Sequence, residues 1–337
     1  MGFVELEYVT YLSHVLFELF LPANVIGFVL SVGIYVKAWM APCHSDDSKW
    51  TGSFFYDLFM GVELNPRMSK LHDWKLFLNG RPGLMLWPLI SLSHLLQAWS
   101  QQAPDYVLVA LGITTLLHFV YTADFYWHEA WYLGTVDMQL DHLGFYMAWG
   151  DNVWVPFLYA SPATIIASVE TSNSVDTLSA LLLITALSLG IIGYAIFRLT
   201  NKEKDYVRDQ IKRGEQKPLT LFGHECLILP CSYLTADGVK RQSSLIASGF
   251  WGVSRHLNYF GDMLLSLGMC LGATAVCVAS GASVSAACLT LSYAAFMFTI
   301  LVHRVGRDER KMRAKYGKAA WLRYAELVPY KILPGVY

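Results

Sequence analysis

The chain has 337 residues, of which 55% are hydrophobic and 15% are charged, and its mean hydropathy is +0.38. These values exclude an ordinary soluble globular domain and are typical of multi-pass membrane proteins. The formal net charge of -1 identifies no partner, and we expect no nucleic-acid partner. Charged residues are confined to short segments between long apolar ones, as in chains that cross a bilayer several times.

Seven apolar segments are each near the length of about 20 residues that spans the hydrocarbon core as a helix. They are residues 20–40, 82–100, 106–126, 143–169, 178–197, 263–279 and 284–302. The short run Ser-Gly-Ala-Ser between the last two predicts a helical hairpin. The sequence therefore predicts an all-α, polytopic membrane fold with about seven transmembrane helices.

Three polar segments, residues 41–81, 200–245 and 303–337, connect or follow these spans. The last two are separated by two crossings, so we expect them on one side of the membrane, where they form a single polar surface. The six cysteines form no C-x-x-C pair and no zinc-site spacing with histidine, so neither a metal site nor a disulfide framework is expected.

Residues 124–154 place ionisable side chains among aromatic ones at or near membrane depth, where charges default to functional or paired roles. His128 and Glu129, with the nearby tyrosines Tyr126, Tyr132 and Tyr146, would be able to protonate an apolar substrate, because burial keeps a carboxyl group protonated. Pairing or capping at helix ends explains any single one of the charged side chains at least as well. These are Asp124, His128, Glu129, Asp137, Asp141, His142 and Asp151.

Two basic side chains follow the apolar segment 178–197. Residues 201–217 predict a continuation of that helix, which places Lys204 and Arg208 one turn apart on the same face. The pair could hold a phosphate group, although basic side chains that end a transmembrane helix explain it more simply when it is considered alone.

Residues 249–262 concentrate aromatic, basic and amide side chains: Trp251, Arg255, His256, Asn258, Tyr259 and Asp262. Nucleotide rings and ribose hydroxyls need such groups, and guanidinium is the preferred bidentate partner of a phosphate. An interfacial aromatic belt would explain Trp251 and Tyr259 but not the Arg-His-x-Asn cluster. The sequence has neither a G-x-G-x-x-G after a strand nor a P-loop, so a nucleotide site must lie between helix ends.

Residues 301–317 change abruptly from an uncharged stretch to dense, mostly basic charge. The basic side chains are Arg304, Arg307, Arg310, Lys311, Arg313, Lys315 and the adjacent Lys318, and they face only Asp308 and Glu309. The pattern predicts a polyanion-binding surface on the cytosolic side of the membrane, with an ordinary positive-inside anchor as the alternative.

Two long motifs resemble the sterol reductases of cholesterol and ergosterol synthesis. The pattern G-x-x-[LIVM]-[YH]-D-x-[FYI]-x-G-x-x-L-N-P-R is met by residues 52–67 except at Phe55. An aliphatic pair followed by H-R-x-x-R-D-x-x-x-C-x-x-K-Y-G is met by residues 301–317, except that Met312 replaces Cys. From the residues alone, the Asn-Pro-Arg end of the first motif reads equally as a buried structural turn or as a cavity lining.

Three runs, residues 129–154, 231–238 and 248–259, resemble the branch of this family that reduces the Δ7 double bond. The Δ14 branch usually has proline where this chain has Leu257. The resemblance implies reduction of the C7=C8 double bond of Δ5,7-sterols by an oxidoreductase that acts on CH–CH groups with NADPH. Reduction of a Δ14 bond is the alternative within the family.

The resemblance also implies which residues contact NADPH: Lys204, Arg208, Ile246, Trp251, Asn258, Tyr259, Asp308, Met312, Arg313, Ala314, Lys315, Tyr316 and Tyr324. For catalysis we expect Glu129 or Tyr146 to supply the proton, and Arg304 and Asp308 to orient the cofactor. One domain is expected, with residues 1–200 as the sterol-binding, transmembrane half and residues 201–337 as the NADPH-binding half.

Further expectations follow from the resemblance. They are a multi-pass location in the endoplasmic reticulum membrane, a sterol substrate that enters from the bilayer, contact with membrane lipid, and association with other enzymes of sterol biosynthesis. Family members usually carry two or more additional N-terminal spans, so we expect this chain to begin near their third.

Two other classes remain open. A membrane methyltransferase of the isoprenylcysteine type has R-H-P-x-Y and E-E…Y-G-x-x-Y patterns that resemble residues 255–259 and 308–324, although Leu257 replaces the proline and Asp308-Glu309 the glutamate pair. A non-catalytic sterol-binding membrane protein is the third reading, and it would bind sterol without consuming NADPH.

Overall fold

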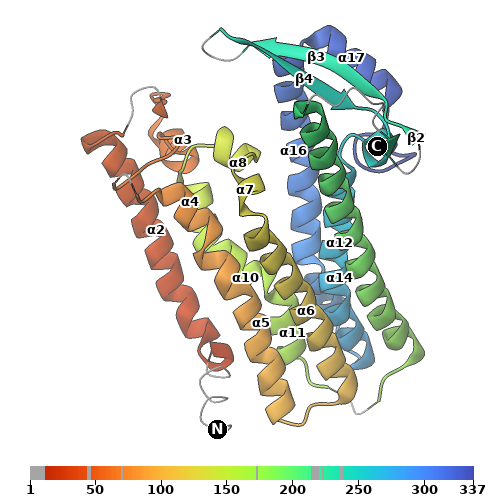
Figure 1. Ribbon diagram of the computed structural model, residues 1–337. Helices are drawn as coiled ribbons and strands as arrows, with labels where there is room; N and C mark the ends of the chain where they lie inside the picture. The colour runs from red at the N-terminus through yellow and green to blue at the C-terminus, as the bar shows by residue number, and fades with distance from the viewer. Residues whose placement is uncertain are drawn as a thin grey trace. The chain divides into compact units, whose positions relative to one another are not determined.

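The computed structural model describes residues 12–43, 47–69, 71–171, 174–213, 220–221, 224–234 and 238–337. The chain divides into two compact units. Unit 1 comprises Met1–Ala186 and Met269–Tyr293, and unit 2 comprises Leu187–Gly268 and Ala294–Tyr337. Three long helices, α12 (Thr177–Lys212), α14 (Leu257–Ala279) and α16 (Ser292–Tyr316), contribute residues to both units (Figure 1).

Unit 1 is otherwise built from helices. They are α2 (Leu16–Met40), α3 (Phe54–Met60), α4 (Trp74–Gly80), α5 (Pro82–Ser100), α6 (Asp105–Trp127), α7 (Glu129–Tyr132), α8 (Val136–Gln139), α9 (Phe145–Trp149), η2 (Gly150–Trp154), α10 (Val155–Tyr159), α11 (Ser161–Ser168) and α15 (Val284–Thr290).

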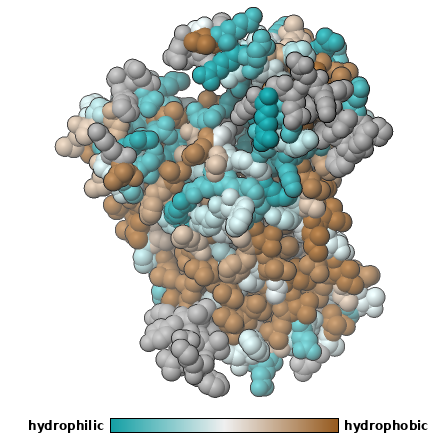
Figure 2. Space-filling model, in the orientation of Figure 1, coloured by the Kyte–Doolittle hydropathy of each residue, from teal (hydrophilic) through white to brown (hydrophobic). Residues whose placement is uncertain are grey.

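Unit 2 adds strands and two short helices: β1 (Thr220–Leu221), β2 (His224–Glu225), β3 (Ile228–Leu234), β4 (Lys240–Ile246), α13 (Phe250–Val253) and α17 (Lys318–Leu327). β3 and β4 form an antiparallel hairpin in the register Ile228–Ile246 to Leu234–Lys240. The prediction of an all-α fold was therefore wrong for the strands β1, β2, β3 and β4, although helices predominate. In Figure 2, hydrophobic side chains cover the lower part of α12, and hydrophilic ones gather near β3 and β4.

Four helices within the described ranges, α2, α6, α12 and α14, are long and apolar enough to cross a membrane. The pair α15 and α16, bent by 46°, gives a fifth if it counts as one span. Multi-pass character is confirmed, whereas the predicted number of seven is not. Two segments account for the difference: α5 contains polar side chains such as His94, and residues 143–169 are divided by the π-helix η2 and by Pro156 and Pro162.

Each unit contains a place where two backbone segments cross closely at glycine residues. In unit 1, a Cβ on Gly61 (φ +89°) would lie 2.4 Å from the carbonyl carbon of Leu143, and the Leu143 amide donates to the Glu63 carbonyl oxygen at 3.0 Å. In unit 2, α12 and α14 meet at Gly193 and Gly261, where an added Cβ would lie 2.4–2.5 Å from backbone nitrogen atoms of the facing helix. Small residues permit such close helix contacts in membranes.

Candidate functional site

A corner of unit 2 joins the polar end of α12 to α13. The Trp251 indole N–H donates to the Thr200 carbonyl oxygen at 2.9 Å, and the Lys204 ammonium group lies 4.9 Å from the centre of the Trp251 ring. Glu203 accepts the backbone N–H of Phe250 at 3.1 Å and so satisfies a donor at the start of α13. The helix end thus presents a cation on an aromatic face, held in place by its neighbour Glu203.

Arg255 has a different role from the phosphate contact that its sequence position suggested. Its guanidinium donates to Glu309 at 2.7 and 2.9 Å, and to the carbonyl oxygens of Val328 and Pro329 at 2.6 and 3.1 Å. The residue is only 6% exposed. Arg255 therefore ties the start of α14 to α16 and to the chain after α17, and it is committed to structure.

Two buried polar atoms follow Arg255 at the start of α14. The Nε2 atom of His256 and the Oδ1 atom of Asn258 have no hydrogen-bond partner among the described residues. Burial lowers the pKa of His256 to about 4, so its ring is neutral at pH 7, and it stacks on Tyr259 with 5.1 Å between ring centres. A neutral imidazole and an amide oxygen without partners suit a ligand that carries hydroxyl or amide groups.

A short hydrogen bond links Tyr259 of α14 to Asp308 of α16 in unit 2. The Tyr259 hydroxyl donates to Oδ2 of Asp308 at 2.6 Å, and Asp308 is buried. Arg304, one turn earlier on α16, lies close enough to Asp262 for their charges to interact. The predicted cofactor residues Asp308 and Tyr259 are thus direct partners.

Several of the other predicted cofactor residues of unit 2 lie on or against the β3–β4 hairpin. Tyr316 and Tyr324 are buried in an apolar cluster with Leu229 and Leu245, and Met312 packs against it. Burial raises the pKa of the Tyr324 hydroxyl, so it remains a neutral hydrogen-bonding group. The remaining members of this set differ in exposure: Ile246 is buried, Lys315 lies over the ring of Tyr233 at 4.3 Å, and Arg208, Arg313 and Ala314 are exposed.

The predicted proton donors Glu129 and Tyr146 both lie in unit 1. Glu129 is an ion-pair partner of Arg81 at 2.6 Å, and each side chain is one-third exposed. Tyr146 packs against the apolar cluster that contains Leu143 and Met147. Glu129 is therefore less buried than a stored proton would require, and proton donation from it would need the Arg81 pair to open.

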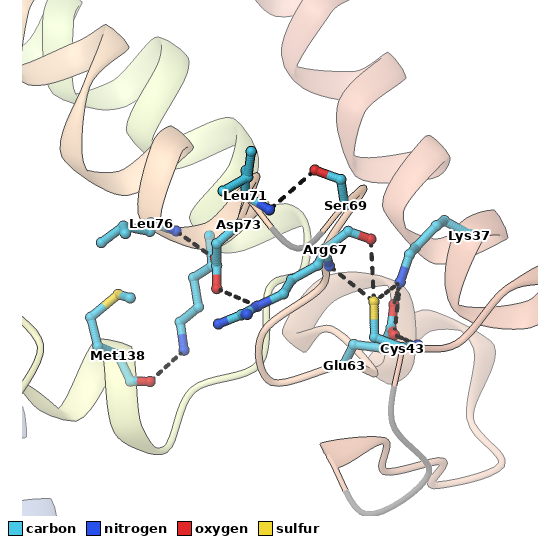
Figure 3. Close-up of polar contacts among 10 residues, drawn as sticks. Lys37, Cys43, Glu63, Arg67, Ser69, Leu71, Asp73, Leu76 and Met138 are labelled. Carbon is cyan, nitrogen blue, oxygen red and sulfur yellow. Dashed lines mark hydrogen bonds and ion pairs between the residues drawn. The ribbon is translucent and has the colours of Figure 1, made fainter.

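In the motif at residues 52–67, α3 is followed by a polar segment, residues 61–67, that is linked to the end of α2 (Figure 3). The Lys37 ammonium donates to both Glu63 carboxylate oxygens at 2.8 and 2.9 Å and to the Cys43 sulfur at 2.8 Å. Cys43 also accepts the Arg67 amide at 3.1 Å, and Arg67 pairs with Asp73 at 3.4 Å. These contacts give Glu63 and Arg67, in the second half of this motif, structural roles, and Arg67 itself is exposed.

Lys75 in α4 is a fully buried cation whose partners are backbone oxygens. Its ammonium donates to the carbonyl oxygens of Met138 at 2.9 Å and Asp141 at 2.6 Å. Burial lowers the pKa of Lys75 from its ordinary 10.5 to about 8. The side chain thereby fixes the turn between α8 and α9 to α4.

This buried lysine predicts a pH dependence of stability. Between pH 8 and 10.5 the folded state has released the Lys75 proton while the unfolded state retains it, so the free energy of unfolding rises with pH. We expect a gain of up to about 3 kcal/mol across this window, measured by denaturant unfolding in detergent. Lys75→Met should remove the gain, whereas Lys49→Met, at an exposed lysine, should retain it. Equal pH slopes for wild type and Lys75→Met would contradict the assignment.

Sequence reasoning missed two acidic residues that organise the unit 2 site. Glu203 holds α13, and Glu309 neutralises Arg255. Each is the sequence neighbour of a residue that was selected, Lys204 or Asp308. The signal in the sequence that could have identified Glu203 and Glu309 was the presence of an acidic residue within a strongly basic segment.

These features define a class: multi-pass helical membrane proteins in which polar and aromatic side chains meet at the ends of helices. The chain belongs to the Ergosterol biosynthesis ERG4/ERG24 family, which it matches over residues 1–337. Family membership confirms the resemblance to sterol reductases that the two long motifs indicated.

Several curated proteins are similar over most of the chain. The 7-dehydrocholesterol reductases of Xenopus laevis and Danio rerio are 42% and 40% identical over 315 and 314 residues, which are 94% and 93% of this chain. The Delta(14)-sterol reductase of Methylotuvimicrobium alcaliphilum is 33% identical over 311 residues, or 92% of this chain. The aligned regions cover 62%, 61% and 63% of those proteins, so the chain spans about three-fifths of their length.

Proposed function

We propose that this protein reduces the C7=C8 double bond of Δ5,7-sterols with NADPH in the membrane of the endoplasmic reticulum. The observation that carries the proposal is a set of side chains in unit 2, which we call the cradle: Lys204 lies on Trp251, and His256 and Asn258 each have a buried polar atom without a partner among the described residues. The identity of 40–42% with two 7-dehydrocholesterol reductases favours the Δ7 bond.

The residues of this cradle fit a dinucleotide phosphate. Lys204 and Arg208 would bind phosphate groups, because both cations extend from the same face of α12. Trp251 offers a stacking face, and His256 and Asn258 offer hydrogen-bonding atoms for ribose or carboxamide groups. NADPH supplies the hydride when it is bound.

Protonation of the substrate is assigned to side chains of this chain. Asp308 accepts a hydrogen bond from the Tyr259 hydroxyl group, and this contact fixes the orientation of the Tyr259 ring. The donor to the sterol is Tyr146, whose hydroxyl oxygen is buried, or Glu129 once its ion pair with Arg81 has opened and its carboxylate has taken up a proton from water. The sterol enters from the bilayer, and the apolar, lipid-contacting helices exclude water from the reacting alkene. Association with other enzymes of sterol biosynthesis belongs to the same proposal.

A second candidate is reduction of a Δ14 double bond. It is favoured by the 33% identity with the Methylotuvimicrobium alcaliphilum Delta(14)-sterol reductase. Both reactions would use the same cradle, so the two differ only in the sterol that is consumed. A Δ8,14-sterol offered beside a Δ5,7-sterol separates them.

The test is sterol reduction by membranes that contain this chain. With NADPH and a Δ5,7-sterol, we expect a Δ5-sterol by mass spectrometry, and Arg304→Ala and Asp308→Ala each to lower the rate by about 100-fold or more. Arg323→Ala, at an exposed arginine of α17, should stay within about twofold of wild type because it is not among the proposed ligand contacts. Full activity in both site variants would disprove the cofactor assignment. Turnover of S-adenosylmethionine instead would indicate the methyltransferase.

A further inference from the structure

Two polar aromatic rings meet in the interior of unit 1. Trp87 of α5 and His118 of α6 are both 0% exposed, and their ring centres lie 4.5 Å apart. One nitrogen of each ring, Nε1 of Trp87 and Nε2 of His118, has no hydrogen-bond partner among the described residues. A buried polar atom without a partner is costly, and polar residues inside membrane helices are functional or paired by default.

The hydrogen bond at the Nδ1 atom of His118 determines whether its Nε2 atom is a donor or an acceptor. Its Nδ1 atom lies 2.8 Å from the Ser91 hydroxyl, which is also 3.4 Å from the Trp87 carbonyl oxygen. If Ser91 donates to Nδ1, then Nε2 carries the proton and the two rings offer two donors. If Ser91 donates to the Trp87 carbonyl, then Nε2 is an acceptor beside the Trp87 donor. One hydroxyl oxygen satisfies both arrangements, because it accepts two hydrogen bonds and also donates.

The surroundings of the pair are apolar and aromatic. The rings of Tyr121, Tyr159 and Tyr293 lie 5.3–5.9 Å from the Trp87 ring, and they come from α6, α10 and α16. An apolar wall with a few placed polar atoms is the usual composition of a small-ligand site. Hydrogen bonds to one oxygen would place it about 3 Å from each nitrogen.

We propose that Trp87 Nε1 and His118 Nε2 together bind one hydroxyl oxygen inside unit 1. Its source is a buried water molecule or the hydroxyl group of an apolar ligand. In the second case the ligand is the sterol, and only that case rests on the proposed function. A water at this place has the two to four polar partners that buried waters require.

The test reads the hydrogen bond of the Trp87 indole directly in the full chain, in lipid nanodiscs and without NADPH. The difference between the ultraviolet resonance Raman spectra of wild type and Trp87→Phe isolates this indole from the other tryptophans. Trp99→Phe on the same helix, at a residue that is 65% exposed, is the matched control and should give the signal of an indole at the protein surface. Spectra are recorded alone, with a 3-hydroxy Δ5,7-sterol, and with its 3-deoxy analogue.

A hydrogen-bonded Trp87 signal without sterol assigns the oxygen to water. A signal that becomes hydrogen-bonded only with the 3-hydroxy sterol assigns the oxygen to the ligand. Trp87→Phe should then weaken binding of that sterol about three- to tenfold and leave binding of the 3-deoxy analogue unchanged. A free indole N–H under all three conditions overturns the proposal.

A second variant keeps Trp87 in place, in case Trp87→Phe does not fold, and it is read as the change between the wild-type and His118→Phe spectra. In His118→Phe the oxygen loses its second contact, so the Trp87 signal should shift toward that of a free N–H. An unchanged, hydrogen-bonded signal would exclude His118 as a ligand and overturn the two-ring site. Because no reduction is measured, failure of these tests is distinct from failure of the proposed sterol reductase activity.

Discussion

Replacing Arg255 with alanine is expected to lower the free energy of unfolding by about 3–5 kcal/mol. The guanidinium is buried against Glu309 at 2.7 Å and also donates to two backbone carbonyls. Its removal leaves Glu309 as a buried carboxylate without its principal cation and leaves the Val328 and Pro329 oxygens unpaired. Denaturant or thermal unfolding of the purified chain in detergent measures the loss.

Arg313 provides the matched control, because it approaches the same carboxylate from the surface. Its guanidinium lies 4.0 Å from Glu309 and its side chain is 53% exposed, so Arg313→Ala should cost only about 0–1 kcal/mol. The double variant Arg255→Met/Glu309→Leu should recover most of the loss, since it removes the buried charge together with its partner. Equal losses for Arg255→Ala and Arg313→Ala would show that burial of the pair has no energetic role.

Alanine at Gly261 is expected to destabilise the contact between α12 and α14 by about 3 kcal/mol, the upper end of the cost of overpacking. The new Cβ would lie 2.5 Å from the Phe197 amide nitrogen and 2.7 Å from the Gly193 carbonyl oxygen. These are backbone atoms of a long helix, so they cannot rotate away as a flexible side chain could. A thermal unfolding midpoint that falls by several degrees would show the effect.

Gly112 of α6 gives the opposite expectation for the same substitution. A Cβ there meets nothing within 4 Å, so Gly112→Ala should be neutral or stabilising by about 0.5–1 kcal/mol through helix propensity. Opposite signs at two glycines in membrane helices would separate close packing from intrinsic propensity. Similar effects at both positions would mean that α12 and α14 do not depend on the crossing.

Sequence patterns predicted the helices whose formation depends on interactions between residues close together in the sequence. The uncharged segment 178–197 followed by charges predicted one continuous helix, and α12 indeed extends to Lys212. Residues 214–217 of that predicted extension lie outside the described residues. Residues 143–169 had the required length, but Pro156, Pro162 and the π-helix divide them, and hydropathy alone does not register such breaks.

Long-range partners explain where the site predictions stopped. Arg255 looked like a phosphate ligand because its partner Glu309 is 54 residues away in sequence, and Glu129 looked like a buried acid because Arg81 is 48 residues away. Nothing in either local segment identifies these pairs. Lys204 and Trp251 were selected for charge and aromatic character, and their contact follows from the same features.

The length of α12 has a consequence for the environment of its polar end. With 36 residues it is about 54 Å long, well beyond the roughly 30 Å of a hydrocarbon core. If residues 178–197 fill that core, Lys204 lies about 10 Å past its edge, at the level of lipid headgroups. Phospholipid phosphates there compete for the same ammonium group. The length of the helix therefore sets the distance of Lys204 from the hydrocarbon core. Deleting one residue between 198 and 202 would turn Glu203 and Lys204 by about 100° away from α13.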